Sequence, residues 1–217
     1  MEKTLLTKEQ QLILKAIGEN EFLAKNFYFS GGTALAEFYL HHRLSEDLDF
    51  FSPNKFDSQT LLTFLKDLSK KENFTYQTQF IDPTYICTLN FQGNLTLKLD
   101  FAYYPYPRLE KGSTYNNLQV DSLTDIAANK LLSILQRTEV KDYVDLFFLL
   151  KKFTLWDLTA KVEKKFNQEI DLLVLASHFT LAEDFTYLPK MIVPTELQEI
   201  KEFFLKEAEK MGRNSTC

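Results

Sequence analysis

The chain has 217 residues and a formal net charge of −5, with hydrophobic residues making up 45% and charged residues 25%. This is the usual composition of a globular protein, and the low numbers of glycine and proline, 6 each, argue against a collagen-like or disordered chain. The acidic balance excludes a strongly basic nucleic-acid-binding domain, although 25 Lys and Arg residues can still gather in a local basic groove.

The cysteines and the N-terminal residues indicate the compartment. Cys87 and Cys217 lie far apart in sequence, which is typical of a reducing environment and gives no disulfide framework. The first residues lead directly into a charged helical pattern without the apolar core of a signal peptide. No apolar run approaches the ~20 residues that cross a bilayer. We therefore expect a cytoplasmic protein with no membrane association.

The first 105 residues alternate between helical and strand patterns. Thr7 and Gln10 form a potential capping box that begins a helix reaching about Ile17. Elsewhere, short apolar or period-two runs predict strands, and runs with a 3.6-residue period predict helices. The predicted strands are 27–30, 48–51, 75–80, 85–91 and 95–103, and the predicted helices are 33–42 and 58–71.

After residue 105 the pattern changes. Residues 105–121 contain Pro, Gly, Ser and Asn and predict a connecting loop. The remaining chain is mostly helical, beginning at a Ser122-x-x-Asp125 cap and ending with a helix that opens at Thr195-x-x-Gln198. The sequence therefore predicts an α+β fold of two domains, an α/β domain over 1–105 and a helical domain over 106–217.

Two aspartates carry the first chemical signal. On a strand, residues two apart point to the same side, so Asp47 and Asp49 place two carboxylates side by side while Leu48 and Phe50 face the core. Adjacent anions repel each other, and burying them without a partner is costly. A divalent cation such as Mg²⁺, which prefers oxygen ligands, removes that cost.

A glycine pair precedes these aspartates. Gly31 and Gly32 break the predicted strand 27–30 before the helix 33–42, and without side chains their backbone can come close to a phosphate group. The Thr33 hydroxyl can add one more donor. We therefore expect phosphates and metal ligands on the same rim of the sheet.

A third carboxylate comes from a later strand. In 97–101, Lys98 and Asp100 alternate with apolar residues and share one face. Next to Asp47 and Asp49, Asp100 completes a triad that can hold two metal ions for phosphoryl chemistry. Asp100 can also act as the general base for an incoming hydroxyl.

Each of these signals has an ordinary alternative when taken singly. An Asp-x-Asp pair is usually a solvated strand end, and Lys98 with Asp100 can be a weak surface ion pair. The conjunction is more specific: a Gly-Gly turn between strand and helix, an Asp-x-Asp pair some fifteen residues later, and a single Asp on a distal strand. It predicts metal-dependent nucleotide chemistry.

The same residues resemble the signature of the polymerase-β-like nucleotidyltransferase superfamily. A narrower similarity to the AbiEii-type nucleotidyltransferases, toxins of bacterial toxin–antitoxin and abortive-infection systems, covers roughly 27–150. It rests on the segments 29–36, 43–50, 98–101 and 125–130, followed by Arg137, Lys141, Asp142 and Asp145. The resemblance implies a nucleotidyltransferase core with a helical C-terminal half, Mg²⁺ or Mn²⁺, an NTP substrate, an RNA (tRNA) or protein acceptor, and a possible cognate antitoxin.

The resemblance also implies two catalytic residues in the helical half, Lys130 and Asp145, so that this half completes the site. If one helix continues through 138–140, positions 130, 134, 137, 141 and 145 share a face. Lys130 can then bind NTP phosphates as a point charge. The alternative is a solvated helix face with surface ion pairs. On either view Lys130 is expected near the surface, where Lys130→Ala changes stability by no more than ~0.5 kcal/mol.

Arg43 and Ser45 match the sequence motif of the family just before Asp47 and Asp49. Together with Lys98 they are candidate nucleotide-binding residues. Arg43 can contact a phosphate or tether its loop to an acidic neighbour, and the sequence favours neither. His41, His42 and His178 show no metal-ligand spacing and are expected at helix ends or on the surface.

The sequence therefore predicts transfer of a nucleoside monophosphate from an NTP, with pyrophosphate release. Two alternatives stay open: a small-molecule nucleotidyltransferase of the antibiotic-modifying kind, and a non-catalytic binding module that keeps the fold. A decayed site is expected to lose a carboxylate, and none is missing here, which favours an enzyme.

Overall fold

The computed structural model describes residues 4–214 and divides them into two compact units. The first consists of 4–39, 45–107 and 111–122, and the second of 40–44, 108–110 and 123–214. Within the described residues no helix is both long and apolar enough to span a bilayer.

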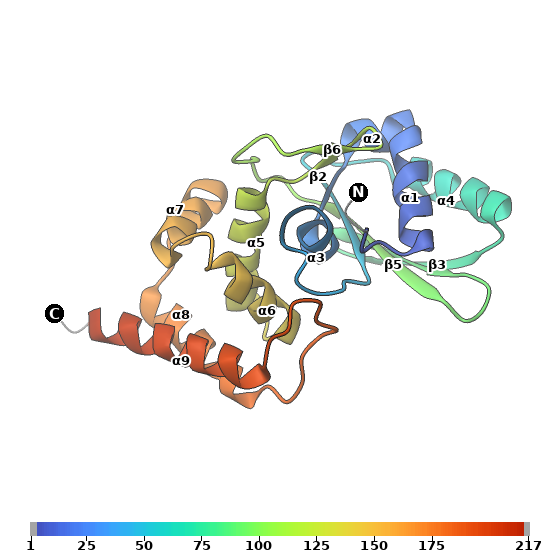
Figure 1. Ribbon diagram of the computed structural model, residues 1–217. Helices are drawn as coiled ribbons and strands as arrows, with labels where there is room; N and C mark the ends of the chain where they lie inside the picture. The colour runs from blue at the N-terminus through green and yellow to red at the C-terminus, as the bar shows by residue number, and fades with distance from the viewer. Residues whose placement is uncertain (1–3, 215–217) are drawn as a thin grey trace. The chain divides into compact units, whose positions relative to one another are not determined.

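Within the described residues the first unit contains a mixed seven-stranded sheet, in the order β3-β4-β5-β2-β1-β7-β6. Strands β2, β3, β5 and β6 of this sheet are labelled in Figure 1. Strand β1 pairs antiparallel with β2 and parallel with β7, and the central strand β2 pairs parallel with β5. The strands are β1 Tyr28–Ser30, β2 Leu48–Ser52, β3 Thr75–Ile81, β4 Thr84–Asn90, β5 Thr96–Tyr103, β6 Thr114–Tyr115 and β7 Leu118–Val120.

Aromatic packing across the central strands makes one face of this sheet the core. Phe29, Phe50 and Phe101 are register partners on β1, β2 and β5 and are fully buried. The Phe50 and Phe101 rings stack with centroids 4.8 Å apart. Burying one such side chain contributes roughly 1.5–3 kcal/mol. This row fixes the register of the strands, and with it the opposite face of β2 and β5.

Polar side chains cap most of the helices of the first unit. The capping box predicted at Thr7 and Gln10 is confirmed, and the Asp57 side chain accepts hydrogen bonds at the start of the fourth helix. The helices are α1 Lys8–Glu19, α2 Glu21–Asn26, α3 Gly31–Leu35, a π-helical turn Ala36–Leu40, and α4 Ser58–Glu72.

The predicted loop at 105–121 was wrong in part, because it contains β6 and β7. Asn116 and Asn117 both have positive φ and join these strands in a tight hairpin, which is typical of Asn in two-residue turns. β7 then pairs with β1, so residues 111–122 belong to the first unit. Gly18 of α1 lies against the turn, where a Cβ would meet the Asn116 carbonyl oxygen at 1.7 Å.

Helices make up the second unit. Its core surrounds Tyr143, which is fully buried, packs edge-on against Phe185 and Phe204, and donates a hydrogen bond from its hydroxyl to the His178 carbonyl. The helices are α5 Leu123–Gln136, α6 Val140–Leu149, α7 Leu155–Phe166, α8 Leu172–Thr180, a 3₁₀ turn Leu181–Asp184, and α9 Leu197–Asn214. The predicted α+β class, with a helical second half, is confirmed.

Candidate active site

The carboxylates of β2 and β5 lie side by side. Asp49 and Asp100 are register partners on these parallel strands. Leu48 and Phe50 are fully buried in the core, so Asp49 points to the opposite face, as the alternation of the sequence predicts. Asp47 lies one residue before β2 begins. The sheet therefore brings Asp49 and Asp100 together, with Asp47 two residues along the chain.

The glycine turn lies directly against one of these carboxylates. Gly31 has φ +74°, a conformation that favours glycine, and a Cβ built on it would stand 1.9 Å from Asp49 Oδ2. Ser30, the residue before it, is the register partner of Asp49 across β1 and β2. In this structure the first glycine therefore makes room for the Asp49 carboxylate.

The loop leading to the carboxylates is held from two helices of the same unit. The buried Thr33 hydroxyl donates a hydrogen bond to the Asp47 carbonyl, so the structure does not show it as the phosphate donor that the sequence suggested. Gln10 donates from Nε2 to the carbonyls of Ser45 and Glu46 at 2.9 and 3.1 Å. Sequence reasoning found Gln10 as a capping residue but missed this second role.

A buried serine and a buried aspartate lie next to Asp49 and Asp100 in the sheet, on β1 and directly after β7. Ser30 donates to Asp121 Oδ2 at 3.0 Å, and both residues are fully buried. The Tyr39 hydroxyl donates to the Asp121 carbonyl at 2.6 Å. Asp121 follows β7, and the sequence missed it because that strand was predicted as a loop. Asp121 therefore binds the last residue of β1, directly before α3 begins at Gly31.

Lys98 pairs with the third carboxylate. Its Nζ lies 2.6 Å from Asp100 Oδ2, and the side chains are 38% and 18% exposed. Burial by itself lowers the pKa of Lys98, but the Asp100 hydrogen bond and the charges of Asp100, Asp47 and Asp49 more than offset it and raise the pKa overall. Burial, with the charge of Asp100, also raises the pKa of the Cys87 thiol to about 12. Cys87 is a free, buried cysteine, and Cys217 lies outside the described residues.

The donor chemistry of these carboxylates fits a divalent cation. Asp100 Oδ1 is buried without a hydrogen-bond partner, and carboxylate oxygens are preferred ligands of Mg²⁺ and Mn²⁺. Over residues 4–214, however, no group of three or more His, Cys, Asp or Glu side chains is arranged to hold a metal ion. The metal role of Asp47, Asp49 and Asp100 thus stays a prediction.

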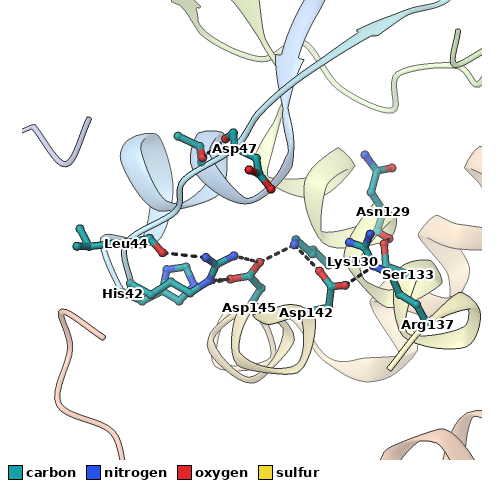
Figure 2. Close-up of polar contacts among 11 residues, drawn as sticks. His42, Leu44, Asp47, Asn129, Lys130, Ser133, Arg137, Asp142 and Asp145 are labelled. Carbon is teal, nitrogen blue, oxygen red and sulfur yellow. Dashed lines mark hydrogen bonds and ion pairs between the residues drawn. The ribbon is translucent and has the colours of Figure 1, made fainter. Parts of the chain in front are cut away.

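A buried charge cluster lies in the second unit (Figure 2). Lys130 Nζ contacts Asp142 Oδ1 at 2.7 Å and Asp145 Oδ2 at 2.6 Å, and both aspartate side chains are fully buried. Arg137 Nε reaches Asp142 Oδ2 at 2.7 Å from the solvent side. Figure 2 shows Lys130 between the two aspartates. Lys130 therefore links α5 to α6 by charge.

Arg43 and His42 complete the cluster from the short segment 40–44. Arg43 donates from Nε and Nη2 to the two oxygens of Asp145 at 2.6 and 2.8 Å, a bidentate geometry. His42 Nε2 lies 2.7 Å from Asp145 Oδ1. Of the two alternatives for Arg43, the tether to an acidic neighbour is the one that the structure shows.

The protonation states of the cluster follow from its charges. Burial raises the pKa of Asp145, but Lys130 and Arg43 outweigh it and hold that pKa well below the usual range. Burial likewise opposes ionisation of Asp142, yet Lys130 and Arg137 lower its pKa. Burial lowers the pKa of Lys130, and the charges of Asp145 and Asp142 raise it overall. Both aspartates and Lys130 are therefore charged at neutral pH.

Three expectations for this region were wrong. A single helix does not run through 138–140, because α5 ends at Gln136 and α6 begins at Val140. Lys130 is not on the surface, since it is 6% exposed, and His42 is fully buried. Fully buried charges need close partners, and the sequence pattern, read as a helix face, gave no sign of burial.

The last third of the chain, in which the sequence showed no motif, pairs with the segment that carries Arg43. The Leu44 amide donates to the Lys190 carbonyl at 2.8 Å, and the His42 carbonyl accepts from the Ile192 and Val193 amides. A second buried pair, Lys165 with Asp125 at 2.7 Å, lies in the same unit. Asp125 also accepts hydrogen bonds from the amides of Leu109 and Glu110.

Comparisons with known proteins agree over nearly the whole chain. A family model described as nucleotidyl transferase AbiEii toxin, Type IV TA system, matches residues 12–213. An uncharacterized protein of Aquifex aeolicus is 33% identical over 215 residues, which is 96% of this chain and 98% of that protein. Two Helicobacter pylori crystal structures, of a candidate nucleotidyltransferase and of JHP933, are similar in fold.

The two Helicobacter pylori structures resemble this chain to a similar degree. The first has a TM-score of 0.60 and 21% identity over 96% of this chain and 97% of that chain. The second has a TM-score of 0.58 and 21% identity over 96% of this chain and 94% of that chain. At this identity the two structures show the fold, and the family model shows the family.

Proposed function

Because the chain belongs to the AbiEii family of nucleotidyltransferase toxins, we propose that it transfers a nucleoside monophosphate from an NTP to a hydroxyl group of RNA, with a tRNA end as the acceptor. The acceptor oxygen forms a bond to the α-phosphorus, and the bond from that phosphorus to the bridging oxygen breaks. Pyrophosphate leaves with the electron pair, and the hydroxyl proton passes to the Asp100 carboxylate.

The single observation that carries this proposal is the carboxylate row, by which we mean Asp49 on β2 and Asp100 on β5 beside the Gly31 backbone at the end of β1. Asp49 stands in register with Asp100, and the Gly31 backbone lies against Asp49 with no room for a side chain. We propose that Asp47, Asp49 and Asp100 hold Mg²⁺ or Mn²⁺, and that Gly31 and Gly32 lie beside the NTP phosphates. When bound, the cation offsets the charge that develops on the transferred phosphoryl group.

Lys130 and Asp145, the family residues of the helical half, are proposed to act by position. Lys130 is engaged by two buried carboxylates, and Asp145 binds Arg43 on two atoms. This supports a role in fixing Arg43 and the segment that continues to Ser45. As a member of a toxin family, the protein is further proposed to act on its host unless a cognate antitoxin opposes it.

Labelled nucleotides test the reaction. The protein is incubated with total RNA and Mg²⁺, and with each NTP labelled in parallel at the α- or the γ-phosphate. We expect label on RNA from the α-position alone, because attack at the α-phosphorus releases the β- and γ-phosphates. Loss of the labelled product on RNase treatment identifies RNA as the acceptor. A parallel reaction with cell extract tests the alternative, because loss of its labelled product on protease treatment would identify a protein acceptor instead.

Two variants make the test specific. Asp100→Asn keeps the shape of the side chain and removes one carboxylate charge, so it is expected to abolish labelling. Asp67→Asn, on the exposed side of α4, makes the same chemical change away from the row and is expected to leave labelling intact. Incorporation from the γ-labelled NTP alone would mean kinase chemistry and contradict the proposal.

A further inference from the structure

Lys98 is a counter-ion already in place among the proposed metal ligands. Its ammonium lies 2.6 Å from Asp100 Oδ2, and the charges of Asp47 and Asp49 also act on it. The other Asp100 oxygen, Oδ1, is buried without a hydrogen-bond partner. One oxygen of the third carboxylate is thus occupied by a lysine, and the other is left for a cation.

This arrangement places Lys98 in competition with a metal ion. A divalent cation that binds Asp100 meets an ammonium on the same carboxylate, and the two positive charges repel each other. The ion pair is partly exposed, with Lys98 38% accessible, so it is held weakly and its release costs little. Lysine carries its charge on a flexible stem with four carbons, which allows the ammonium to change partners.

We propose that Lys98 couples nucleotide binding to metal binding, holding Asp100 in the free protein and transferring its ammonium to the NTP phosphates when nucleotide arrives. The inference rests on the proposed nucleotidyl transfer and adds an order to it. A triphosphate carries several negative charges against the single charge of Asp100, so it attracts the ammonium more strongly. Asp100 is then released to the cation, and by linkage each ligand raises the affinity for the other.

The test measures Mn²⁺ binding by calorimetry, without nucleotide and then with an NTP analogue whose α,β-bridging oxygen is a methylene group. Titration of the analogue with Mn²⁺ in the absence of protein supplies the correction for the metal–nucleotide complex. Lys98→Met keeps the length of the side chain and removes its charge. We expect it to tighten Mn²⁺ binding without nucleotide by about fivefold, the change that ~1 kcal/mol of ion pair corresponds to.

The second expected result is a smaller gain from the nucleotide. Adding the analogue is expected to tighten Mn²⁺ binding in the wild type by a factor that shrinks about fivefold in Lys98→Met, since the competing ammonium is gone. Lys66→Met, which removes an exposed lysine of α4, is the matched control and should behave as the wild type. Equal melting temperatures of the three proteins exclude a folding defect.

The outcomes separate the two proposals. If the wild type binds Mn²⁺, Asp100→Asn abolishes binding, and Lys98→Met binds no more tightly than the wild type, the coupling inference is overturned while the metal site stands. If Mn²⁺ binding is absent from the wild type and from Lys98→Met, with and without the analogue, both the inference and the proposed metal site fail.

Discussion

Gly31 is where the geometry of the carboxylate row depends on one missing methyl group. A Cβ at this position would overlap Asp49 Oδ2 at 1.9 Å, and the backbone has φ +74°. Gly93, in the turn between β4 and β5, has nearly the same φ, +77°, but nothing within 4 Å of its Cβ position. The chain therefore contains two glycines that share a backbone conformation and differ in their surroundings.

This pair gives the first prediction. Gly31→Ala and Gly93→Ala should each lose about 1–2 kcal/mol of unfolding free energy from the left-handed backbone, and Gly31→Ala should lose more because its Cβ also overlaps Asp49. Only Gly31→Ala displaces Asp49, and displacement by ~1 Å can cost about 100-fold in rate. Denaturant titration and transfer assays on both variants measure the two effects. Equal transfer rates in both would show that the contact with Asp49 has no functional weight.

Sequence reasoning placed Asp47, Asp49 and Asp100 on or beside the right strands, because alternation with buried residues such as Leu48 and Phe50 is a local property. It did not find that Gly31 lies against Asp49 or that Thr33 bonds to the Asp47 carbonyl. Those contacts depend on how β1 packs against β2. Residues that are distant in sequence but close in space produce no periodic pattern, so the sequence gives no sign of such a contact.

At the scale of elements, the interruption between α5 and α6 determines the charge cluster. Because the helix ends at Gln136 and restarts at Val140, Lys130 and Asp142 face each other from two helices instead of following one face. Lys130 offsets two fully buried carboxylates, and removing one partner of a buried ion pair costs about 3–5 kcal/mol. The loss of at most ~0.5 kcal/mol expected for a surface lysine is therefore too small, and a loss of about 3–5 kcal/mol is expected instead.

Lys130→Ala is accordingly predicted to lower the free energy of unfolding by about 3–5 kcal/mol. Lys164→Ala, an exposed lysine near the end of α7, removes the same charge and should stay within ~0.5 kcal/mol of the wild type. Urea titration followed by circular dichroism measures both. A loss from Lys130→Ala as small as that from Lys164→Ala would mean that the buried cluster contributes little to stability.

The hairpin of β6 and β7 shows what the sequence contained but did not resolve. Asn116-Asn117 is a signal for a two-residue turn, since Asn tolerates positive φ, yet the strands beside it are only two and three residues long. Strands this short show almost no alternation. β7 exists because β1 offers it a partner, and that partner comes from residues some ninety positions earlier, as the Ser30–Asp121 hydrogen bond shows.

At the scale of the whole molecule, we expect the protein to arrest the growth of a bacterial host. Inducing the protein in a bacterial host should stop growth, because the family is one of toxins, and Asp49→Ala should be harmless at equal expression. Asp67→Ala, on the exposed side of α4, should remain toxic. Growth curves with immunoblots for expression measure this. Arrest that persists with Asp49→Ala would separate toxicity from transfer.

The chain order of the charge cluster also bears on how the protein is made. The carboxylate that neutralises Arg43 lies 102 residues later, and the amides that pair with the His42 carbonyl come with Ile192 and Val193. At about 5–20 residues per second, a ribosome needs about 5–20 s to add those 102 residues. Throughout that interval the nascent Arg43 has no Asp145 to bind. The hydrogen bonds from the Ile192 and Val193 amides to the His42 carbonyl form later still, so a chain that ends before residue 192 lacks both of them.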